Sequence, residues 1–461
     1  MFKLFRHYVP TSLVLLVLIE LVVFYISFLL GIEIRFYRTD EIIRQELNPV
    51  EIKAIVFALI MWLSMTAVGL HTRNVVDDFA GLMIRIFLSF TLGFVGVALA
   101  FYVKPELFIG RGAFALALLI SFFGILITRT FYQKLDNHKI FRRKILVLGT
   151  GDQASLIDQI SNQCMSRGME IIGFVHIDQN DPKISANKLL DIQTTLYDLV
   201  EEYHIDDIVL AMDDRRKGFP VAGLIECKMN GINILDIVKF LEIVTGHIEL
   251  HVLHPSVLIF TEGAIRPGFG KRIFDVVVSL AVLTIASPII LLTGLAIWLS
   301  SFGRDPVFYR QVRVGICDKP FKVLKFRSMK VDAEKDGAQM AKKKDSRVTL
   351  IGKFIRKTRI DELPQLINVL RGDMSFVGPR PERPEFVLGY NQDIPNYTLR
   401  HTVKPGITGW AQVSYPYGDT LEDTRQKLQY DLYYIKNYSL FFDFTIMLQT
   451  IQVVLFGQGA R

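Results

Sequence analysis

Four long apolar runs open the chain and alternate with short polar segments. They cover Ser12–Leu30, Ala54–Leu70, Ile86–Val103 and Gly112–Thr128. Each has close to the roughly 20 residues that an α-helix needs to cross a hydrocarbon core of about 30 Å. The pattern therefore predicts a four-helix transmembrane bundle within residues 1–135. Only the first run carries a charge, Glu20, which we expect to face the interior of the bundle.

Basic residues predict the side of the membrane on which each loop lies. Lys3 and Arg6 precede the first run, and a basic cluster from Arg129 to Lys144 follows the fourth. The loop between the third and fourth runs carries only two basic residues. Because Lys and Arg concentrate in cytoplasmic loops, the amino terminus and everything after Thr130 are predicted to be cytoplasmic.

Residues 136–250 change to short apolar strands that alternate with helical patterns. Strands are predicted at Lys144–Leu148, Ile171–Val175, Asp207–Ala211 and Asn233–Ile237. Helices are predicted from the glycine turn to about Met165, then at Leu190–His204 and Phe219–Met229. This alternation is typical of a parallel sheet covered by helices, so the segment is predicted to be a Rossmann-like α/β domain.

A glycine fingerprint follows the first of these strands. Gly149, Gly151 and Ala154 form a G-x-G-x-x-A pattern, and Asp178 is the acidic residue expected further on. One interpretation is an NAD-type dinucleotide site, in which amides at a helix start bind the diphosphate. The other is a glycine turn in a doubly wound domain whose site is empty or reused. The sequence leaves both open.

A second membrane element follows a linker at residues 251–267. The stretch Val276–Gly303 contains no Asp, Glu, Lys or Arg, which makes it long enough to span a bilayer. Ser287-Pro288 stands near its middle, and proline interrupts the helical hydrogen bonds there. Basic residues flank it on both sides. We therefore predict a re-entrant helix over residues 272–303, with both ends on the cytoplasmic side.

Composition and charge narrow the function classes. The net charge of +7 would suit a nucleic acid, an anionic lipid or a phosphate-rich substrate, but no basic repeat or aromatic-interleaved basic stripe supports nucleic-acid binding. The three cysteines are far apart, so reduced thiols are expected instead of a zinc site or disulfides. The first apolar run lacks a cleavage site and is not predicted to be a removable signal peptide.

The densest candidate chemistry lies between Arg356 and Asp373. Apolar residues at helical spacing predict an amphipathic helix with Asp361 as its N-cap and Gly372 at its end. The helix dipole would keep the Asp361 carboxylate ionised and suited to nucleophilic attack. Glu362 beside it is a candidate ligand for Mg²⁺. Taken alone, an acidic pair is also common at the N-terminus of a helix, where it caps the helix without any catalytic role.

Neighbouring motifs strengthen the chemical interpretation. Lys325-Phe-Arg327-Ser-Met precedes the acidic pair, and Arg380 follows it between two prolines. An arginine on such a restricted backbone is suited to a bidentate grip on phosphate. The segment Lys404–Val413 adds turn-forming glycines around a tryptophan.

These motifs, in this order and together with Lys271–Asp275, resemble the bacterial sugar transferase family of monotopic phosphoglycosyl transferases over roughly 268–461. The preceding bundle and α/β domain are similar to those of its large members, the exopolysaccharide polyprenyl glycosylphosphotransferases. The resemblance implies a mainly helical catalytic domain at 268–461, anchored by a re-entrant helix broken at Ser-Pro. It places the enzyme in the bacterial inner membrane, with its catalytic domain on the cytoplasmic face.

The resemblance also implies a reaction and residue roles. Asp361 would attack the sugar-linked phosphate of a UDP-sugar, release UMP and form a phosphosugar-aspartyl intermediate, which undecaprenyl phosphate would then attack. Glu362 would hold Mg²⁺. Phosphates would be positioned by Lys325, Arg327, Arg356 and Arg380, with Asp431 as a further acidic position at the site. The product would initiate exopolysaccharide, capsule or O-antigen assembly.

Two rival interpretations are weaker. A nucleotide-sugar dehydratase or epimerase resembling short-chain dehydrogenases would carry Tyr-x-x-x-Lys, and none of the sixteen tyrosines has a lysine four residues on. A non-enzymatic scaffold with decayed motifs conflicts with the intact pair Asp361-Glu362. The sequence does not identify the sugar. The bundle and the α/β domain offer surface for a homodimer, and membrane lipid is an expected partner.

Overall fold

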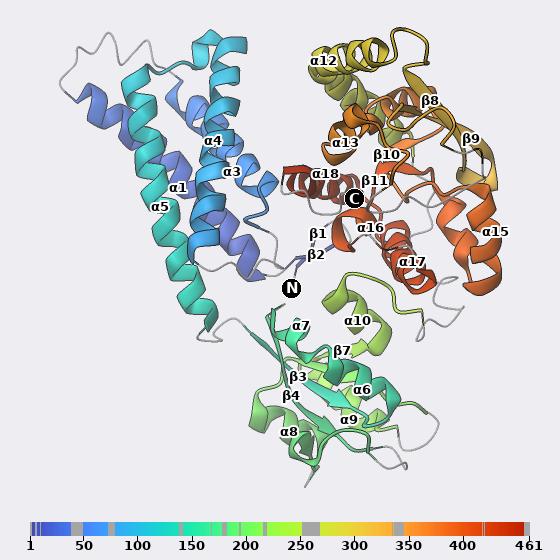
Figure 1. Ribbon diagram of the computed structural model, residues 1–461. Coiled ribbons are helices and arrows are strands. Elements are labelled where there is room, and N and C mark those ends of the chain that lie inside the picture. The colour runs from blue at the N-terminus through green and yellow to red at the C-terminus, as the bar shows by residue number, and fades with distance from the viewer. Residues whose placement is uncertain are drawn as a thin grey trace. The chain divides into compact units, whose positions relative to one another are not determined.

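The computed structural model contains two compact units, Met1–Leu4 with Tyr8–Thr245 and Phe5–His7 with Gly246–Arg461 (Figure 1). The structure describes residues 2–4, 7–9, 11–37, 49–71, 79–137, 142–166, 168–177, 182–192, 195–214, 219–250, 268–333, 335, 345–416, 418 and 420–455. The predicted linker at 251–267 lies outside them. Two short strands, β1 (Phe2–Leu4) and β2 (His7–Val9), begin the chain.

All four predicted membrane runs form helices. They are α1 (Thr11–Phe36), α3 (Val50–Ala67), α4 (Phe79–Val103) and α5 (Arg111–Asn137), with the short turn η1 (Pro105–Leu107) before the last. With α12 described below, five of the described helices are long and apolar enough to cross a membrane. The chain is therefore a membrane protein with a helical amino-terminal region.

Aromatic side chains fill the interior of this bundle, and Glu20 faces it as predicted. Phe24, Phe28 and Phe57 are almost completely buried there. Glu20 is also fully buried, and its carboxylate lies 2.6 Å from both Arg129 and His71. Pairing satisfies a charge that would be costly to bury alone.

The predicted α/β domain is a five-stranded parallel sheet in the order β5-β4-β3-β6-β7. Its strands are β3 (Arg143–Leu148), β4 (Met169–Val175), β5 (Leu189–Leu190), β6 (Asp207–Leu210) and β7 (Asn233–Asp236). Its helices are α6 (Asp152–Gln159), α7 (Ser161–Ser166), η2 (Ala186–Lys188), α8 (Leu196–Tyr203), α9 (Val221–Met229) and α10 (Ile237–Thr245). The four predicted strands are confirmed.

Two helix predictions in this domain were wrong in detail. The helix predicted at Leu190–His204 starts only at Leu196, because Thr195 caps it in a reciprocal box with Asp198, while Leu190 pairs with β4. The helix predicted to run to about Met165 is interrupted at Ile160. The strand β5 and the helix α10 were not predicted.

The second unit is mainly helical, as predicted, with two small sheets. Its helices and turns are α12 (Phe269–Ser300), η3 (Ile316–Asp318), α13 (Leu350–Lys357), η4 (Ile360–Glu362), α14 (Gln365–Arg371), α15 (Pro384–Asp393), η5 (Tyr397–Thr402), α16 (Trp410–Ser414), α17 (Leu421–Lys436) and α18 (Leu440–Leu455). The antiparallel pair is β8 (Phe308–Val314) and β9 (Pro320–Phe326), and the parallel pair is β10 (Ser375–Val377) and β11 (Gly406–Thr408).

Three glycines let the backbone cross closely beside β10 and β11. A Cβ on Gly378 would lie 2.4 Å from the Lys404 carbonyl oxygen, and a Cβ on Gly409 would lie 2.2 Å from the Gly378 oxygen. Gly406 is equally tight, since its Cβ would lie 2.1 Å from the Gly378 nitrogen. Any larger residue would force these segments apart. The crossing fixes the start of the segment that carries Arg380.

The helix α12 runs continuously through Pro288, and both of its ends pack on the second unit. Near its start, Arg272 donates to the carbonyl oxygens of Val369 and Leu370 at 2.5 and 2.6 Å. Near its end, Ile297 is buried in one apolar cluster with Phe326 and Ile355. The break that we predicted at Ser287-Pro288 does not interrupt the assigned helix.

A buried ion network ties the start of α12 to α18. Lys271 lies 2.9 Å from Asp275 and 2.8 Å from Asp443, and Asp443 accepts a hydrogen bond from Tyr434. Phe442 of α18 is fully buried. The helix α18 therefore packs into the core of the second unit.

Candidate active site

A pocket of about 840 Å³ opens in the second unit, lined by the β8–β9 hairpin, η4 and the start of α17, among other segments. Its volume is in the range of sites for nucleotide-sized ligands. Twelve basic and four acidic side chains line it in the described part of the chain. Such an excess of positive charge favours polyanionic ligands. Every substrate-site residue predicted from the sequence lines this pocket: Lys325, Arg327, Arg356, Asp361, Glu362, Arg380 and Asp431.

Asp361 reaches the pocket from a 3₁₀ turn, so its predicted N-cap position was wrong. It lies in η4, and α14 begins only at Gln365 with Pro364 as its N-cap. The amides of Glu362 and Leu363 donate to the carbonyl oxygens three residues earlier, so this segment forms a separate 3₁₀ turn and not the first turn of α14. Arg359, the residue before this turn, has a left-handed backbone conformation with φ +58°. The helix-dipole argument for an ionised Asp361 therefore fails.

Burial sets the ionisation of Asp361 instead. It is 9% exposed. Burial and the neighbouring Glu362 carboxylate raise the pKa of Asp361 to about 6, while Lys325 and Arg356 act in the opposite direction. The carboxylate forms no hydrogen bond or ion pair with any of the described residues. Asp361 is thus anionic at neutral pH and unengaged, which suits a nucleophile.

Glu362 is held quite differently. Its Oε1 lies 3.1 Å from Lys325 Nζ and 2.8 Å from Arg380, and its Oε2 lies 3.8 Å from Arg359. Burial alone would raise the pKa of Glu362, but Arg380, Lys325 and Arg359 together hold it well below its usual range. Burial also lowers the pKa of Lys325. Glu362 therefore organises the cations that surround Asp361.

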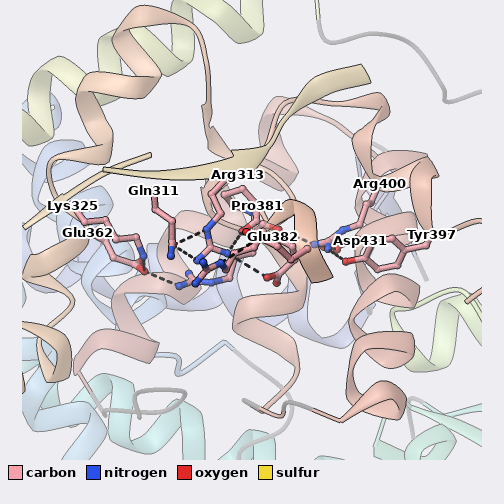
Figure 2. A network of polar contacts seen from close by, with 12 residues as sticks. Gln311, Arg313, Lys325, Glu362, Pro381, Glu382, Tyr397, Arg400 and Asp431 are labelled. Atoms are coloured by element: carbon pink, nitrogen blue, oxygen red, sulfur yellow. Dashed lines mark hydrogen bonds and ion pairs between the residues drawn. The ribbon is translucent and has the colours of Figure 1, made fainter. Parts of the chain in front are cut away.

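Two arginines bind the chain around Arg380, and Figure 2 shows one of them, Arg313, beside Pro381 and Glu382. Arg313 donates to the Pro381 carbonyl oxygen at 3.0 Å and lies 3.4 Å from Glu382. Arg400 donates to the carbonyl oxygen of Arg380 at 2.9 Å. Gln311 in turn accepts from Arg313 at 2.7 Å. The flanking prolines and these contacts direct the Arg380 guanidinium toward Glu362.

Asp431 is a buried carboxylate at the pocket. It is 2% exposed and pairs with Arg400 at 2.8 Å. Burial raises the pKa of Asp431 to about 6 even though Arg400 opposes the shift. Arg400 also donates to the Tyr397 hydroxyl at 2.5 Å. Asp431 therefore positions Arg400 by an ion pair, and Arg400 in turn binds the carbonyl oxygen of Arg380.

The remaining predicted cations line the same pocket from other elements. Arg327 lies 3.6 Å from Asp305, just after the end of α12. Arg356 projects from the last turn of α13, and within the described residues its side chain has no carboxylate partner. It is therefore available to an anionic ligand.

Sequence reasoning missed Arg313, Arg400 and Glu382. Arg313 is one charged position in an alternating strand, and Arg400 lies in the turn η5 with no surrounding motif. Their roles depend on contacts with residues distant in the sequence. Arg313 contacts Pro381, 68 positions away, and Arg400 contacts Arg380, 20 positions away. Only the tertiary structure brings them to the Arg380 segment.

The residues predicted for a dinucleotide lie elsewhere, in the α/β domain. Gly149 and Gly151 form the turn between β3 and α6, as predicted. Asp178 lies outside the described residues. The first two amides of α6 donate to the carboxylate of Asp213, at 2.8 Å from Asp152 and 3.0 Å from Gln153. These amides are the ones that would meet the phosphates of a bound cofactor.

Fold and site together define a membrane-associated protein with a cation-rich pocket around one unengaged carboxylate. The profile of the family described as bacterial sugar transferase matches residues 267–457, and that of a family described as a CoA-binding domain matches residues 66–227.

Several proteins from other bacteria are similar to this chain. The UDP-N-acetylgalactosamine-undecaprenyl-phosphate N-acetylgalactosaminephosphotransferase of Aeromonas hydrophila is 44% identical over 253 residues, 54% of this chain and 58% of that protein. The UDP-glucose:undecaprenyl-phosphate glucose-1-phosphate transferase of Escherichia coli (strain K12) is 38% identical over 331 residues, 69% of this chain and 68% of that protein. The enzyme of the same name from Caulobacter vibrioides is 40% identical over 219 residues, 45% of this chain and 80% of that protein.

The chain therefore belongs to the bacterial sugar transferase family, as the resemblance of its motifs predicted. The match spans somewhat more than half of the Aeromonas hydrophila protein.

Proposed function

We propose that this chain transfers a sugar 1-phosphate from a UDP-sugar to undecaprenyl phosphate and releases UMP. The observation that carries the proposal is the unengaged Asp361 carboxylate in a pocket whose cations are already fixed by Glu362 and the Arg380 segment. The names of the three relatives describe transfer of a sugar phosphate to undecaprenyl phosphate, which supports the same reaction.

In the first step, a carboxylate oxygen of Asp361 attacks the phosphorus that carries the sugar. A bond forms between this oxygen and phosphorus, and the bond from phosphorus to the bridging oxygen of the diphosphate breaks. UMP leaves with the bridging oxygen, and the sugar phosphate stays on Asp361 as an acyl phosphate. Arg356, Arg380 and Lys325 neutralise the charge on the phosphates, which is the main requirement of phosphoryl transfer.

In the second step, a phosphate oxygen of undecaprenyl phosphate attacks the same phosphorus. The bond between phosphorus and Asp361 breaks, and the carboxylate is regenerated. The product is undecaprenyl diphosphate carrying the sugar. We assign Arg327 to this lipid phosphate because it lies beside Asp305, close to the end of the apolar helix α12.

Glu362 fits a Mg²⁺ site completed by substrate phosphates and water, which is how Mg²⁺ is usually bound in such sites. Its Oε1 is occupied by Lys325 and Arg380, whereas Oε2 lies 3.8 Å from Arg359, beyond hydrogen-bond distance, and can supply an oxygen to the metal. When bound, Mg²⁺ would neutralise charge on the diphosphate.

The helix α12 is proposed to enter the membrane and return to the same side. A straight helix of 32 residues would be about 48 Å long, longer than a hydrocarbon core of about 30 Å. Both ends contact the second unit, through Arg272 and through Ile297. One folded unit cannot lie on both faces of a bilayer. These contacts support a re-entrant helix. They also support an active site on the cytoplasmic face of the inner membrane, because UDP-sugars are available in the cytoplasm.

The product lipid is proposed to initiate exopolysaccharide, capsule or O-antigen assembly. The reaction and the identity of the transferred sugar can be tested together. The purified full chain in lipid nanodiscs is incubated with undecaprenyl phosphate, Mg²⁺ and a panel of UDP-sugars. We expect one or a few of these sugars to give UMP and a lipid-linked sugar diphosphate. Release of UDP instead of UMP would replace the proposal with an ordinary glycosyl transfer.

A further inference from the structure

The order of the strands in the α/β domain locates its ligand crevice. The chain leaves β3 toward β4 on one side and later returns to place β6 on the other side. In doubly wound folds, ligands bind at the carboxyl ends of the strands at this change of direction. The turn at Gly149–Gly151 and the segment after β6 meet here, because the Ala211 amide donates to the Leu148 carbonyl oxygen at 2.8 Å.

Asp213 fills the anion position of this crevice. Its Oδ2 accepts from the amide of Asp152 at 2.8 Å, and its Oδ1 accepts from the amide of Gln153 at 3.0 Å. The first amides of a helix have no partner within the helix and lie at its positive end. A carboxylate that takes both of them occupies the place where a cofactor phosphate would bind.

The glycine fingerprint is explained by this internal contact. A Cβ on Gly151 would lie 1.9 Å from Asp213 Oδ2. Gly149 has φ +121°, and its Cβ would lie 2.3 Å from the Ala211 carbonyl oxygen. Both glycines therefore permit the segment after β6 to approach α6. The pattern that suggests a cofactor in the sequence is needed here for the packing of the chain on itself.

The local charge also opposes a diphosphate. Asp152 adds a second carboxylate in the first turn of α6. The only cation paired with it in the described residues is Lys183, at 2.5 Å. An incoming diphosphate would have to displace Asp213 and then lie beside Asp152. The residues of this crevice do not fit the phosphates of coenzyme A or of a dinucleotide.

We propose that Asp213 is an internal substitute for the cofactor phosphate, so that this domain folds with its phosphate site closed by its own chain and binds neither coenzyme A nor a dinucleotide through that turn. The proposal concerns the α/β domain alone and does not depend on the reaction assigned to Asp361. It decides between the two interpretations of the glycine pattern in favour of a reused site.

Hydrogen exchange of the full chain in nanodiscs, read by mass spectrometry on peptides covering residues 150–155, tests the proposal. In the wild type, addition of 1 mM coenzyme A, NAD⁺ or pyrophosphate should leave exchange of these amides unchanged. Asp213→Ala should speed exchange at Asp152 and Gln153 by about tenfold or more, because it frees both amides. Gly151→Ala should do the same by pushing the Asp213 carboxylate away.

Asp158→Ala is the matched control, because it removes a carboxylate of the same helix that pairs with Lys188 and contacts neither amide. It should leave exchange at residues 150–155 as in the wild type. Protection of the wild-type peptide by any of the three ligands would overturn the proposal, and this arm needs no variant to fold. Unchanged exchange in a folded Asp213→Ala protein would overturn it as well.

Discussion

The pocket around Asp361 and the turn at Gly149–Gly151 are two phosphate sites suggested by the same sequence, and they differ in what occupies their anion positions. In the pocket, the chain's own carboxylate Glu362 orients the cations, whereas Asp361 and Arg356 have no ion-pair partner among the residues that the structure describes. At the turn, the carboxylate of Asp213 takes the amides themselves. One site is organised for an incoming anion, and the other is already filled.

This difference shows what a short motif can establish. A glycine pattern reports a backbone conformation and a close approach, and the approaching group can be a ligand or another segment of the chain. A set of motifs that supplies a nucleophile, a second acid and several cations has fewer alternative explanations. The internal partner can be identified only once distant segments are placed together.

The largest effect is expected from removing the nucleophile. Asp361→Asn should lower UMP release by about 1,000-fold or more, because the amide cannot form the acyl phosphate. The carboxylate has no described partner, so the variant should keep the wild-type melting temperature. Asp393→Asn, an exposed carboxylate outside the pocket, is the control and should keep full activity. Near-normal turnover by Asp361→Asn would exclude the assignment.

A smaller loss is expected from residues that act through Arg380. Arg400→Leu should lower kcat/KM by about 10- to 100-fold, since it releases the Arg380 carbonyl and misplaces the guanidinium. It also leaves the buried Asp431 carboxylate unpaired, so the fold will be destabilised. Arg400→Lys, which keeps the charge, should recover stability more than activity. Equal recovery of both would indicate a purely structural role.

The pH profile should report Asp361. Its carboxyl is protonated below its raised pKa of about 6 and cannot attack, so kcat/KM should fall as the pH drops through about 6. Arg359→Gln removes a cation that lowers this pKa, and should move the acid limb to higher pH. Asp431 has a pKa of similar value, so Asp431→Asn is the necessary control. If Asp431→Asn loses the acid limb, the limb reports protonation of Asp431, and its attribution to Asp361 is contradicted.

A truncation that isolates the second unit tests how much the residues just before the linker contribute to its stability. The structure places Gly246 and Ile248 within this unit: Trp410 donates to the Gly246 carbonyl oxygen at 2.7 Å, and Ile248 is 1% exposed. A chain starting at Gly246 should therefore be more stable than one starting at Leu253 by about 2–4 kcal/mol. Equal urea midpoints would contradict this difference.

The smallest effect should come from the closed turn. Asp213→Ala lies outside the second unit and should leave kcat/KM for UMP release within about twofold of the wild type, because distant sites usually act independently. The assay is the same as for Asp361→Asn. A tenfold loss in folded protein would show that the α/β domain influences catalysis, and would remove the separation between the two sites.

Much of this architecture followed from local pattern. Apolar length predicted the membrane helices, and strand–helix alternation predicted the parallel sheet, because both are set by neighbouring residues. The start of α8 was misplaced because the capping pair Thr195–Asp198 outweighs a continuous apolar spacing. Asp361 was misplaced at the start of a helix because its segment forms a separate 3₁₀ turn, and α14 begins only at Gln365. Arg313, Arg400 and Asp213 could not be predicted, since each acts on a segment distant in the sequence.

The central claim is that Asp361 carries the sugar phosphate between the two substrates. Full-length protein mixed with UDP-sugar and Mg²⁺, without undecaprenyl phosphate, should release a burst of UMP equal to the amount of enzyme and then stop. Mass spectrometry should find the sugar phosphate on the peptide that contains Asp361, and adding undecaprenyl phosphate should discharge it. UMP release that requires undecaprenyl phosphate from the first turnover, with no labelled peptide, would contradict the account and indicate direct transfer.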